Sequence, residues 1–169
     1  MNVSTRGAWS KLRGAVRGFV LLLLGSVVVA APSAQADNRR LNQSVFSNIY
    51  TAQYMNGCQV EPTFDARLSE AARRHTFDVR DHPDIGGDIG SDGSSPQDRA
   101  NGAGFVGKVS QTVAVNPALA ISGIEILNQW WTDPVARAIM QDCSNTAIGV
   151  WSENSLARSV VVAVYGQPT

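Results

Sequence analysis

Apolar residues recur every three or four positions in two stretches of the chain, which predicts two amphipathic helices over residues 41–56 and 66–81. Gly57 ends the first helix, and Pro83 prevents the second from continuing. His75 lies on the apolar stripe of the second helix, so its imidazole is expected to point toward the core. The apolar residues of the two stripes are Leu41, Val45, Phe46, Ile49, Tyr50, Leu68, Ala72 and Val79.

The segment after the second helix is irregular. Residues 80–95 are rich in Asp, Gly and Ser without periodicity, which is typical of a loop. Two capping boxes follow, Ser95 with Asp98 and Ser122 with Glu125. Each predicts the start of a helix, because the paired side chains satisfy amide groups that the first turn leaves free.

Strands are predicted in the second half of the chain. Residues 109–115 alternate in polarity, and Gln111 is a polar residue on their apolar face. After a short helix over residues 135–141, two β-rich runs over residues 146–152 and 156–165 predict a hairpin. Strands and helices do not alternate regularly as in a doubly wound sheet, so the order of elements predicts a single α+β domain.

The first 36 residues have the parts of a secretory signal peptide. Cationic residues precede an apolar run over residues 19–31, and Ala34-Gln35-Ala36 matches a small-x-small cleavage site. Cleavage after Ala36 would leave a domain over residues 37–169, either secreted or held in the cell envelope. An uncleaved membrane anchor is the alternative, but the run has 13 residues and a spanning helix needs about 20. We therefore expect no integral membrane segment in the mature chain.

The charge of this mature chain limits its partners. Four of the 14 cationic residues precede residue 37, so ten remain against 14 acidic residues, a net charge of about −4. Nucleic acid binding requires clustered cations, whereas these are scattered. This excludes nucleic acid as a partner.

Cys58 and Cys143 are the only cysteines of the chain. An even number in an exported chain favours one disulfide between them. Closing so long a loop would stabilise the fold by roughly 4 to 5 kcal/mol in the chain-entropy account. A pair of reactive or metal-binding thiols is the alternative, but the spacing is not C-x-x-C and neither cysteine has a His within a turn.

Several segments, in their order and spacing, carry a resemblance to a known family. They are Leu68-x-x-Ala71-Ala72-x-x-His75, Gly90-Ser91-Asp92-Gly93-Ser94-Ser95-Pro96-x-Asp98-Arg99, Gln129-Trp130 with Pro134 and Arg137, and Ala147-Ile148-Gly149-Val150. The chain resembles bacterial proteins of the CAP superfamily, called SCP-like after cysteine-rich secretory proteins, antigen 5 and pathogenesis-related 1. The resemblance covers residues 41–165 and implies an α-β-α sandwich.

The family usually has a pocket of two His and two acidic residues. Its loop commonly reads Ser-His-x-Gly-Ser-Asp-Gly, which places the first His at Asp88. The Glu of a Gly-Glu-Asn segment falls at Gln111, and the His of a Ser-Pro-Gly-His-Arg segment falls at Ala136. Glu125 matches the remaining acidic position, although its capping box explains it equally well. Both imidazoles are therefore missing from the matched positions.

These substitutions bear on metal binding. Zinc takes three or four nitrogen, sulfur or carboxylate ligands, and the matched positions offer only Asp88 and Glu125, so we expect no cofactor and no tight metal site. His75 and His82 are the candidate replacements, with His75 expected to be a hydrogen-bonded core residue. A calcium loop that began at Asp88 would need a Glu where Arg99 stands.

Two classes of function remain. Loss of the tetrad favours a secreted, non-catalytic domain that binds a lipid or other apolar small molecule, or an envelope partner; lipid binding is implied by the resemblance alone. The alternative is a divergent hydrolase or metal-binding module with a rebuilt site around His82, Asp88 and Glu125, although no Gly-x-Ser-x-Gly nucleophile motif is present. Large aromatic residues that line either a groove or the core are Trp130, Trp131 and Trp151.

Overall fold

The computed structural model describes residues 34–117, 121–155 and 157–169. The apolar run at residues 19–31 and most of the predicted signal peptide lie outside the described residues. The described residues belong to one compact unit, Pro32–Thr169. Among the helices of this described part, none is long and apolar enough to cross a membrane.

The described residues form five helices and four strands, and every predicted helix and strand is present. In chain order they are α1 (Ala34–Met55), β1 (Thr63–Phe64), α2 (Ala66–Asp81), α3 (Pro96–Gly102), β2 (Gly107–Asn116), α4 (Gly123–Thr132), α5 (Pro134–Gln141), β3 (Ala147–Asn154) and β4 (Ser159–Pro168).

Two features differ from the prediction. β1 was not predicted, because a strand of two residues shows no alternation. α1 begins at Ala34 rather than at residue 41. Its polar first turns are held by a tertiary contact, since Ser152 Oγ donates to the carbonyl oxygen of Asn38 at 3.3 Å. Cleavage after Ala36 would remove only the first residues of this helix.

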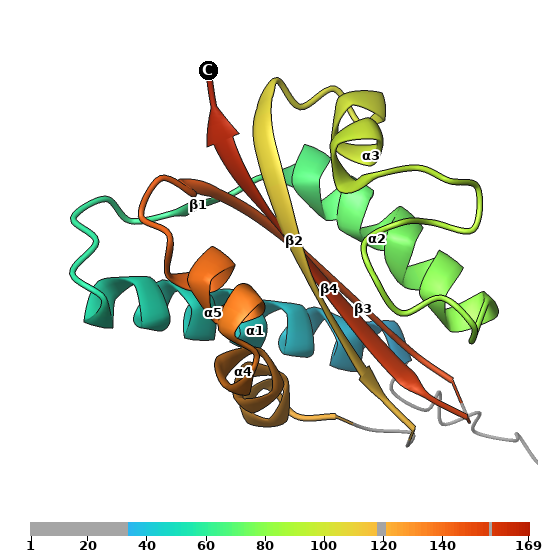
Figure 1. Cartoon of the computed structure of the whole chain (residues 1–169). Coiled ribbons are helices and arrows are strands. Elements are labelled where there is room, and N and C mark those ends of the chain that lie inside the picture. The colour runs from blue at the N-terminus through green and yellow to red at the C-terminus, as the bar shows by residue number, and fades with distance from the viewer. Residues whose placement is uncertain (1–33, 118–120, 156) are drawn as a thin grey trace, which may run out of the picture. The chain divides into compact units, whose positions relative to one another are not determined.

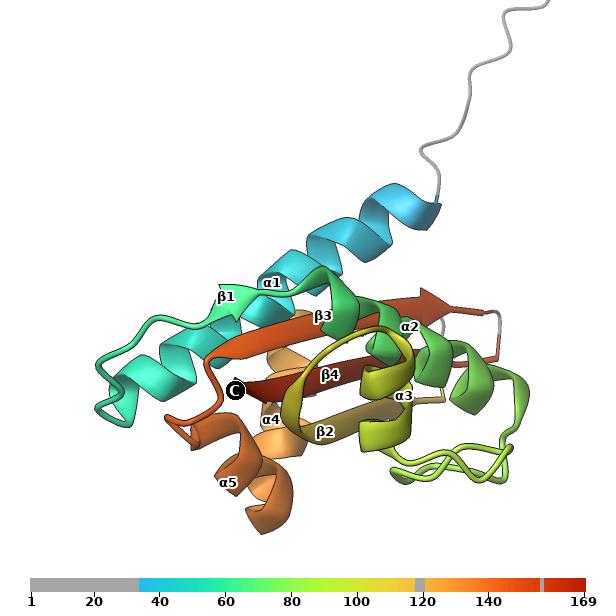
Figure 2. The same cartoon turned by 90° about the horizontal axis from the view of Figure 1, so that it is seen from above.

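The strands form one sheet in the order β1-β3-β4-β2, in which β4 pairs antiparallel with both β3 and β2, and β1 pairs parallel with β3. Helices α1, α4 and α5 cover one face of the sheet, and α2 and α3 cover the other (Figure 1). Seen from above, α3 lies over the strands and α4 lies beneath them (Figure 2). This three-layer arrangement confirms the predicted α+β class and the α-β-α sandwich.

Each face of the sheet has its own apolar core, and β4 contributes to both. Val161, Ala163 and Tyr165 pack on the side of α1, α4 and α5, whereas Val160 and Val162 pack on the side of α2 and α3. A strand with both faces covered has a continuous apolar run. This explains why the end of the sequence is so rich in valine.

Helix α2 approaches β3 very closely at Gly149. A Cβ atom on Gly149 would lie 2.0 Å from Ser69 N and 2.2 Å from Leu68 C, so only glycine fits there. Beside this contact, Ser69 Oγ donates to Val150 O at 3.1 Å and accepts from Val150 N at 3.2 Å. The Ser69 side chain therefore satisfies main-chain groups of β3 that no strand pairs.

The predicted disulfide is present. Cys58 and Cys143 are bonded, with their Cα atoms 5.1 Å apart. The bond joins the segment after α1 to the segment after α5, on the same side of the sheet. It closes a loop with a sequence separation of 85 residues, long enough for a large entropic effect on the unfolded chain.

Candidate functional site

Three of the four positions matched to the family tetrad meet at the edge strand β2. Asp88, Gln111 and Ala136 line a groove of about 230 Å³ between the loop at residues 86–88 and the start of α5. Glu125 does not line this groove. It is exposed at the start of α4, where its Oε2 accepts from the Ser122 amide at 2.7 Å, and this bond lowers the pKa of Glu125.

Gln111 is 3% exposed and uses both ends of its amide. Its Oε1 accepts from Arg99 Nη2 at 3.0 Å, and its Nε2 donates to Asp88 Oδ1 at 3.2 Å. An ionised Glu could not make the second bond, because a carboxylate has no donor. The Gln111 amide therefore bonds directly to the Asp88 carboxylate, and this contact needs no cation to bridge the two side chains.

Arg99 is a buried cation behind this groove, and the sequence pattern did not reveal its role. Its Nη1 donates to Ser94 O at 2.7 Å, and its Nη2 donates to Asp88 O at 2.7 Å. Burial lowers the pKa of Arg99, and nearby carboxylates, first among them Asp92, oppose this effect. The guanidinium holds the Asp- and Gly-rich loop against β2.

His75 is fully buried, as its place on the apolar stripe predicted. Its Nε2 lies 2.8 Å from the carbonyl oxygen of Gly87. Because a carbonyl oxygen only accepts hydrogen bonds, Nε2 carries the proton, and in the neutral ring Nδ1 is unprotonated. Burial and the neighbouring Arg99 charge lower the pKa of His75, which favours the neutral ring. The imidazole therefore supports the loop that forms the wall of the groove.

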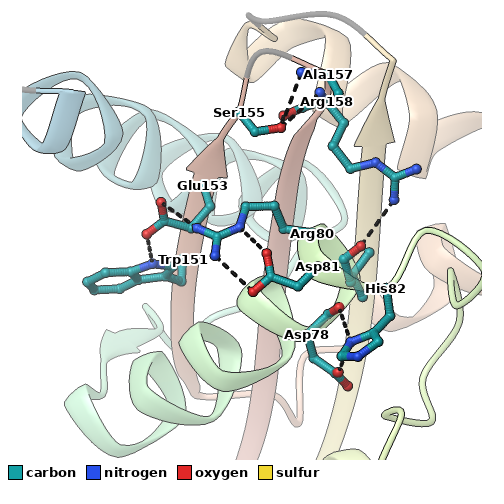
Figure 3. A network of polar contacts seen from close by, with 10 residues as sticks. Asp78, Arg80, Asp81, His82, Trp151, Glu153, Ser155, Ala157 and Arg158 are labelled. Atoms are coloured by element: carbon teal, nitrogen blue, oxygen red, sulfur yellow. Dashed lines mark hydrogen bonds and ion pairs between the residues drawn. The ribbon is translucent and has the colours of Figure 1, made fainter.

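His82 is exposed and belongs to a different cluster, at the end of α2 (Figure 3). Its Nδ1 lies 2.8 Å from Asp78 Oδ1, and Asp78 Oδ2 also accepts from the Ser91 amide at 2.8 Å. Neither His82 nor Glu125 lines the groove that holds Asp88. Within residues 34–117, 121–155 and 157–169, no three His, Cys, Asp or Glu side chains are grouped to hold a metal ion.

A larger groove lies at the opposite edge of the sheet, between α1 and α2, with a volume of about 550 Å³. We call it the aromatic groove. Phe46 of α1 meets Phe64 of β1 edge to face, with ring centroids 6.4 Å apart. Phe64 is 60% exposed. The lining residues are Arg39, Asn42, Gln43, Phe46, Phe64, Ala66, Ser69, Glu70, Val150 and Trp151.

The shortness of β1 creates this groove. β1 pairs only with Ala147 and Ile148, so no strand covers the edge of β3 beyond them. Val150 and Trp151 lie on that uncovered part and line the groove. The first helix supplies the opposite wall through Phe46, which the helical periodicity had marked as apolar.

A second groove of about 500 Å³ adjoins the aromatic groove and shares Arg39, Asn42 and Trp151 with it. The Trp151 indole is held in place because its Nε1 donates to Glu153 Oε1 at 2.9 Å (Figure 3). Arg80 Nη1 lies 4.0 Å from Glu153 Oε2. Trp151 is thus a groove residue, which the sequence had left open.

The other two tryptophans among the described residues have different roles. Trp130 is 2% exposed and belongs to the core on the side of α1. Trp131 is 40% exposed, with the guanidinium carbon of Arg137 5.9 Å from its ring centroid. Neither lines the aromatic groove.

The charges around the aromatic groove are unevenly compensated. Glu70 Oε2 accepts from Arg73 Nε at 2.7 Å, and Glu70 Oε1 accepts from Arg74 Nε at 3.0 Å. The bond from Arg73 is the largest of the effects that lower the pKa of Glu70 to about 2. Arg39 is exposed, and no ion pair in the described part of the chain includes it. Neither Arg39 nor Phe64 stands in a recognisable sequence motif, so only the folded structure reveals that they line this groove.

The sequence matches no protein-family model and no curated protein. The structure, in contrast, is similar to solved structures. An extracellular protein containing a SCP domain from Bacillus anthracis gives a TM-score of 0.68 at 12% identity, over 82% of this chain and 45% of that chain. The present chain therefore spans less than half of that protein.

Two further structures are matched over most of their own length. An outer surface protein from Borrelia burgdorferi gives a TM-score of 0.64 at 14% identity, over 75% of this chain and 92% of that chain. Venom allergen-like protein 4 from Schistosoma mansoni gives a TM-score of 0.55 at 12% identity, over 75% of this chain and 87% of that chain. Identities this low are evidence of a shared fold alone, and this chain has the fold of the CAP, or SCP-like, superfamily.

Proposed function

We propose that this chain is an exported, non-catalytic CAP-fold domain that binds an apolar molecule in the aromatic groove. The observation that carries the proposal is the groove itself, an open hollow of about 550 Å³ with a mainly apolar lining. Small-molecule sites typically have volumes of roughly 300 to 1,000 Å³. Covering such apolar surface removes it from water, which is favourable.

The placement of the histidines supports binding rather than bond breaking. A nucleophile or an activated water needs a base within hydrogen-bond reach. The groove at β2 contains Asp88 and Gln111 but no imidazole. His75 is buried against a main-chain carbonyl, and His82 is paired with Asp78.

Export is part of the proposal, with residues 1–36 as a signal peptide and residues 37–169 as the mature domain. The disulfide supports it, because such bonds persist in oxidising compartments. Two of the similar structures are described as an extracellular protein and an outer surface protein. The proposed location is the medium or the cell envelope.

The groove is tested with the neutral fluorescent probe N-phenylnaphthylamine and the variant Phe64→Glu. We expect the wild type to bind the probe and the variant to bind it at least about tenfold more weakly, because one buried aromatic contact is worth about 1.5 to 3 kcal/mol. Ile89→Glu is the matched control, since Ile89 is 55% exposed and lies outside the groove. No binding by the wild type, or equal loss in both variants, contradicts the proposal.

The non-catalytic assignment has its own test. Wild type and His82→Ala are assayed against protease, muramidase and esterase substrates, and we expect no turnover by either. Activity that His82→Ala abolishes would establish the alternative, a hydrolase with a rebuilt site.

A further inference from the structure

We propose that the groove next to the aromatic groove is a second binding site, and that its ligand is a short saccharide stacked on Trp151. We call it the polar groove. Its volume of about 500 Å³ is within the range typical of small-molecule sites, roughly 300 to 1,000 Å³. The proposal goes beyond the apolar ligand of the aromatic groove and does not depend on it. The residues that line the polar groove are Asn38, Arg39, Asn42, Arg73, Phe77, Trp151 and Glu153.

The lining of the polar groove has the mixed character of a sugar. Two aromatic rings, Phe77 and Trp151, lie among side chains that carry amide, guanidinium or carboxylate groups. The hydroxyl groups around a sugar ring donate and accept hydrogen bonds, whereas the C–H groups on one ring face are apolar. A flat indole can cover such a C–H face while planar polar groups bond the hydroxyls. A purely apolar ligand would leave these polar groups without partners, which costs free energy.

The Trp151 indole is held in one orientation. The side chain packs against the core on the side of α2 and lines the polar groove. Its Nε1 donates to Glu153 Oε1 at 2.9 Å, and Arg80 Nη1 lies 4.0 Å from Glu153 Oε2 (Figure 3). Because the ring and the carboxylate are already fixed, stacking a sugar on the indole would cost little side-chain entropy.

Two asparagines of α1 have unpaired amide groups at the polar groove. Asn42 Oδ1 is buried and has no hydrogen-bond partner among the described residues. Asn38 Oδ1 accepts from Asn154 Nδ2 at 2.9 Å, whereas Asn38 Nδ2 donates to no residue of the described part of the chain. One asparagine therefore offers an acceptor and the other a donor. A sugar hydroxyl group can satisfy either of them, because it both donates and accepts.

Arg73 adds a further donor on the α2 side of the groove. Its Nε and Nη2 donate to Glu70 at 2.7 and 3.0 Å, and Nη1 donates to no described residue. Phe77 positions this guanidinium, since the guanidinium carbon of Arg73 lies 5.5 Å from the ring centroid of Phe77. The polar groove thus has hydrogen-bonding groups on its α1 and α2 sides and an aromatic ring from β3.

Calorimetric titration of the full mature chain with two β-1,4-linked trisaccharides, chitotriose and cellotriose, tests the proposal. We expect the wild type to bind at least one of them with a Kd of about a millimolar or tighter. Trp151→Ala should reduce this binding below detection. Trp131→Ala is the matched control, because Trp131 is also partly exposed, at 40%, and lines neither groove. Binding of neither trisaccharide by the wild type, or equal loss in the two variants, overturns the proposal.

A second pair of variants separates the polar groove from the aromatic groove. Asn38→Asp replaces the unpaired donor by an acceptor of similar size, and should weaken trisaccharide binding about fivefold. It should leave binding of N-phenylnaphthylamine unchanged, because Asn38 does not line the aromatic groove. Phe64→Glu should do the opposite, since Phe64 does not line the polar groove. Unchanged trisaccharide binding in Asn38→Asp, or loss of both ligands in either variant, overturns the assignment of a separate saccharide site.

Discussion

Replacing Gly149 by Ala should be among the most damaging single changes in this fold. The added Cβ atom would lie 2.0 Å from Ser69 N, whereas ordinary contacts begin at 3.4 Å, so α2 would have to retreat from β3 by about 1.4 Å. The clash is with backbone atoms, which no change of rotamer relieves. Overpacking typically costs about 1 to 3 kcal/mol, occasionally more, and we expect a loss of about 3 kcal/mol or more here.

The assay is urea unfolding of oxidised protein, followed by far-UV circular dichroism. Gly87→Ala is the matched control, because its Cβ would meet no atom within 4 Å; its free energy of unfolding should stay within about 0.5 kcal/mol of the wild type. Ser69 and Val150 line the aromatic groove, so the shift of α2 in Gly149→Ala should also weaken binding of the fluorescent probe. A stability loss below about 1 kcal/mol in Gly149→Ala would refute the reasoning.

Three further predictions concern pH, metal and redox state. The folded-state pKa of His75 is lowered from 6.5; the contribution of the neutral ring to stability is therefore complete above pH 6.5 and is lost as pH falls toward the folded-state pKa. Between neutral and mildly acidic pH, the melting temperature should fall more steeply for the wild type than for His75→Asn. Identical slopes of melting temperature against pH in the two proteins would count against this. Calorimetry with zinc should detect no binding tighter than about a micromolar, since the matched positions at Asp88 and Ala136 lack imidazoles. Reduction of the bond between Cys58 and Cys143 should lower the free energy of unfolding by about 4 kcal/mol, and an unchanged urea midpoint would contradict this.

The helices were predictable because their signals are local. The capping boxes at Ser95 and Ser122 both form as expected, with the side chain of the third residue accepting from the cap amide in each. Asp65 accepts from the amides of Arg67 and Leu68 at the start of α2. A cap and an apolar stripe depend on residues within a few turns, so the sequence is sufficient to identify them.

The groove at β2 was predictable only in part. The resemblance placed Asp88, Gln111 and Ala136 in one pocket, and the structure brings them together. It does not bring Glu125 there, because the Ser122 cap holds that side chain at the start of α4. Arg99 joins the loop to β2 through hydrogen bonds to partners 5 to 12 positions away in sequence. No sequence pattern predicts such hydrogen bonds.

The aromatic groove could not be predicted from the sequence. Its residues come from α1, β1, α2 and β3, and each has an ordinary local explanation as part of a helix stripe or a strand. The opening exists because β1 ends at Phe64 and leaves the edge of β3 uncovered. A strand of two residues follows from pairing with β3 and has no periodicity of its own.

The amino-acid order alone determined the helices, the longer strands and the pairing of its only two cysteines, because these depend on near neighbours or on composition. The tertiary structure decided which strands are adjacent, where Arg99 is buried and which side chains share a groove. Those properties arise from contacts between residues far apart in the chain, and their energies depend on distance and burial that only the folded arrangement defines.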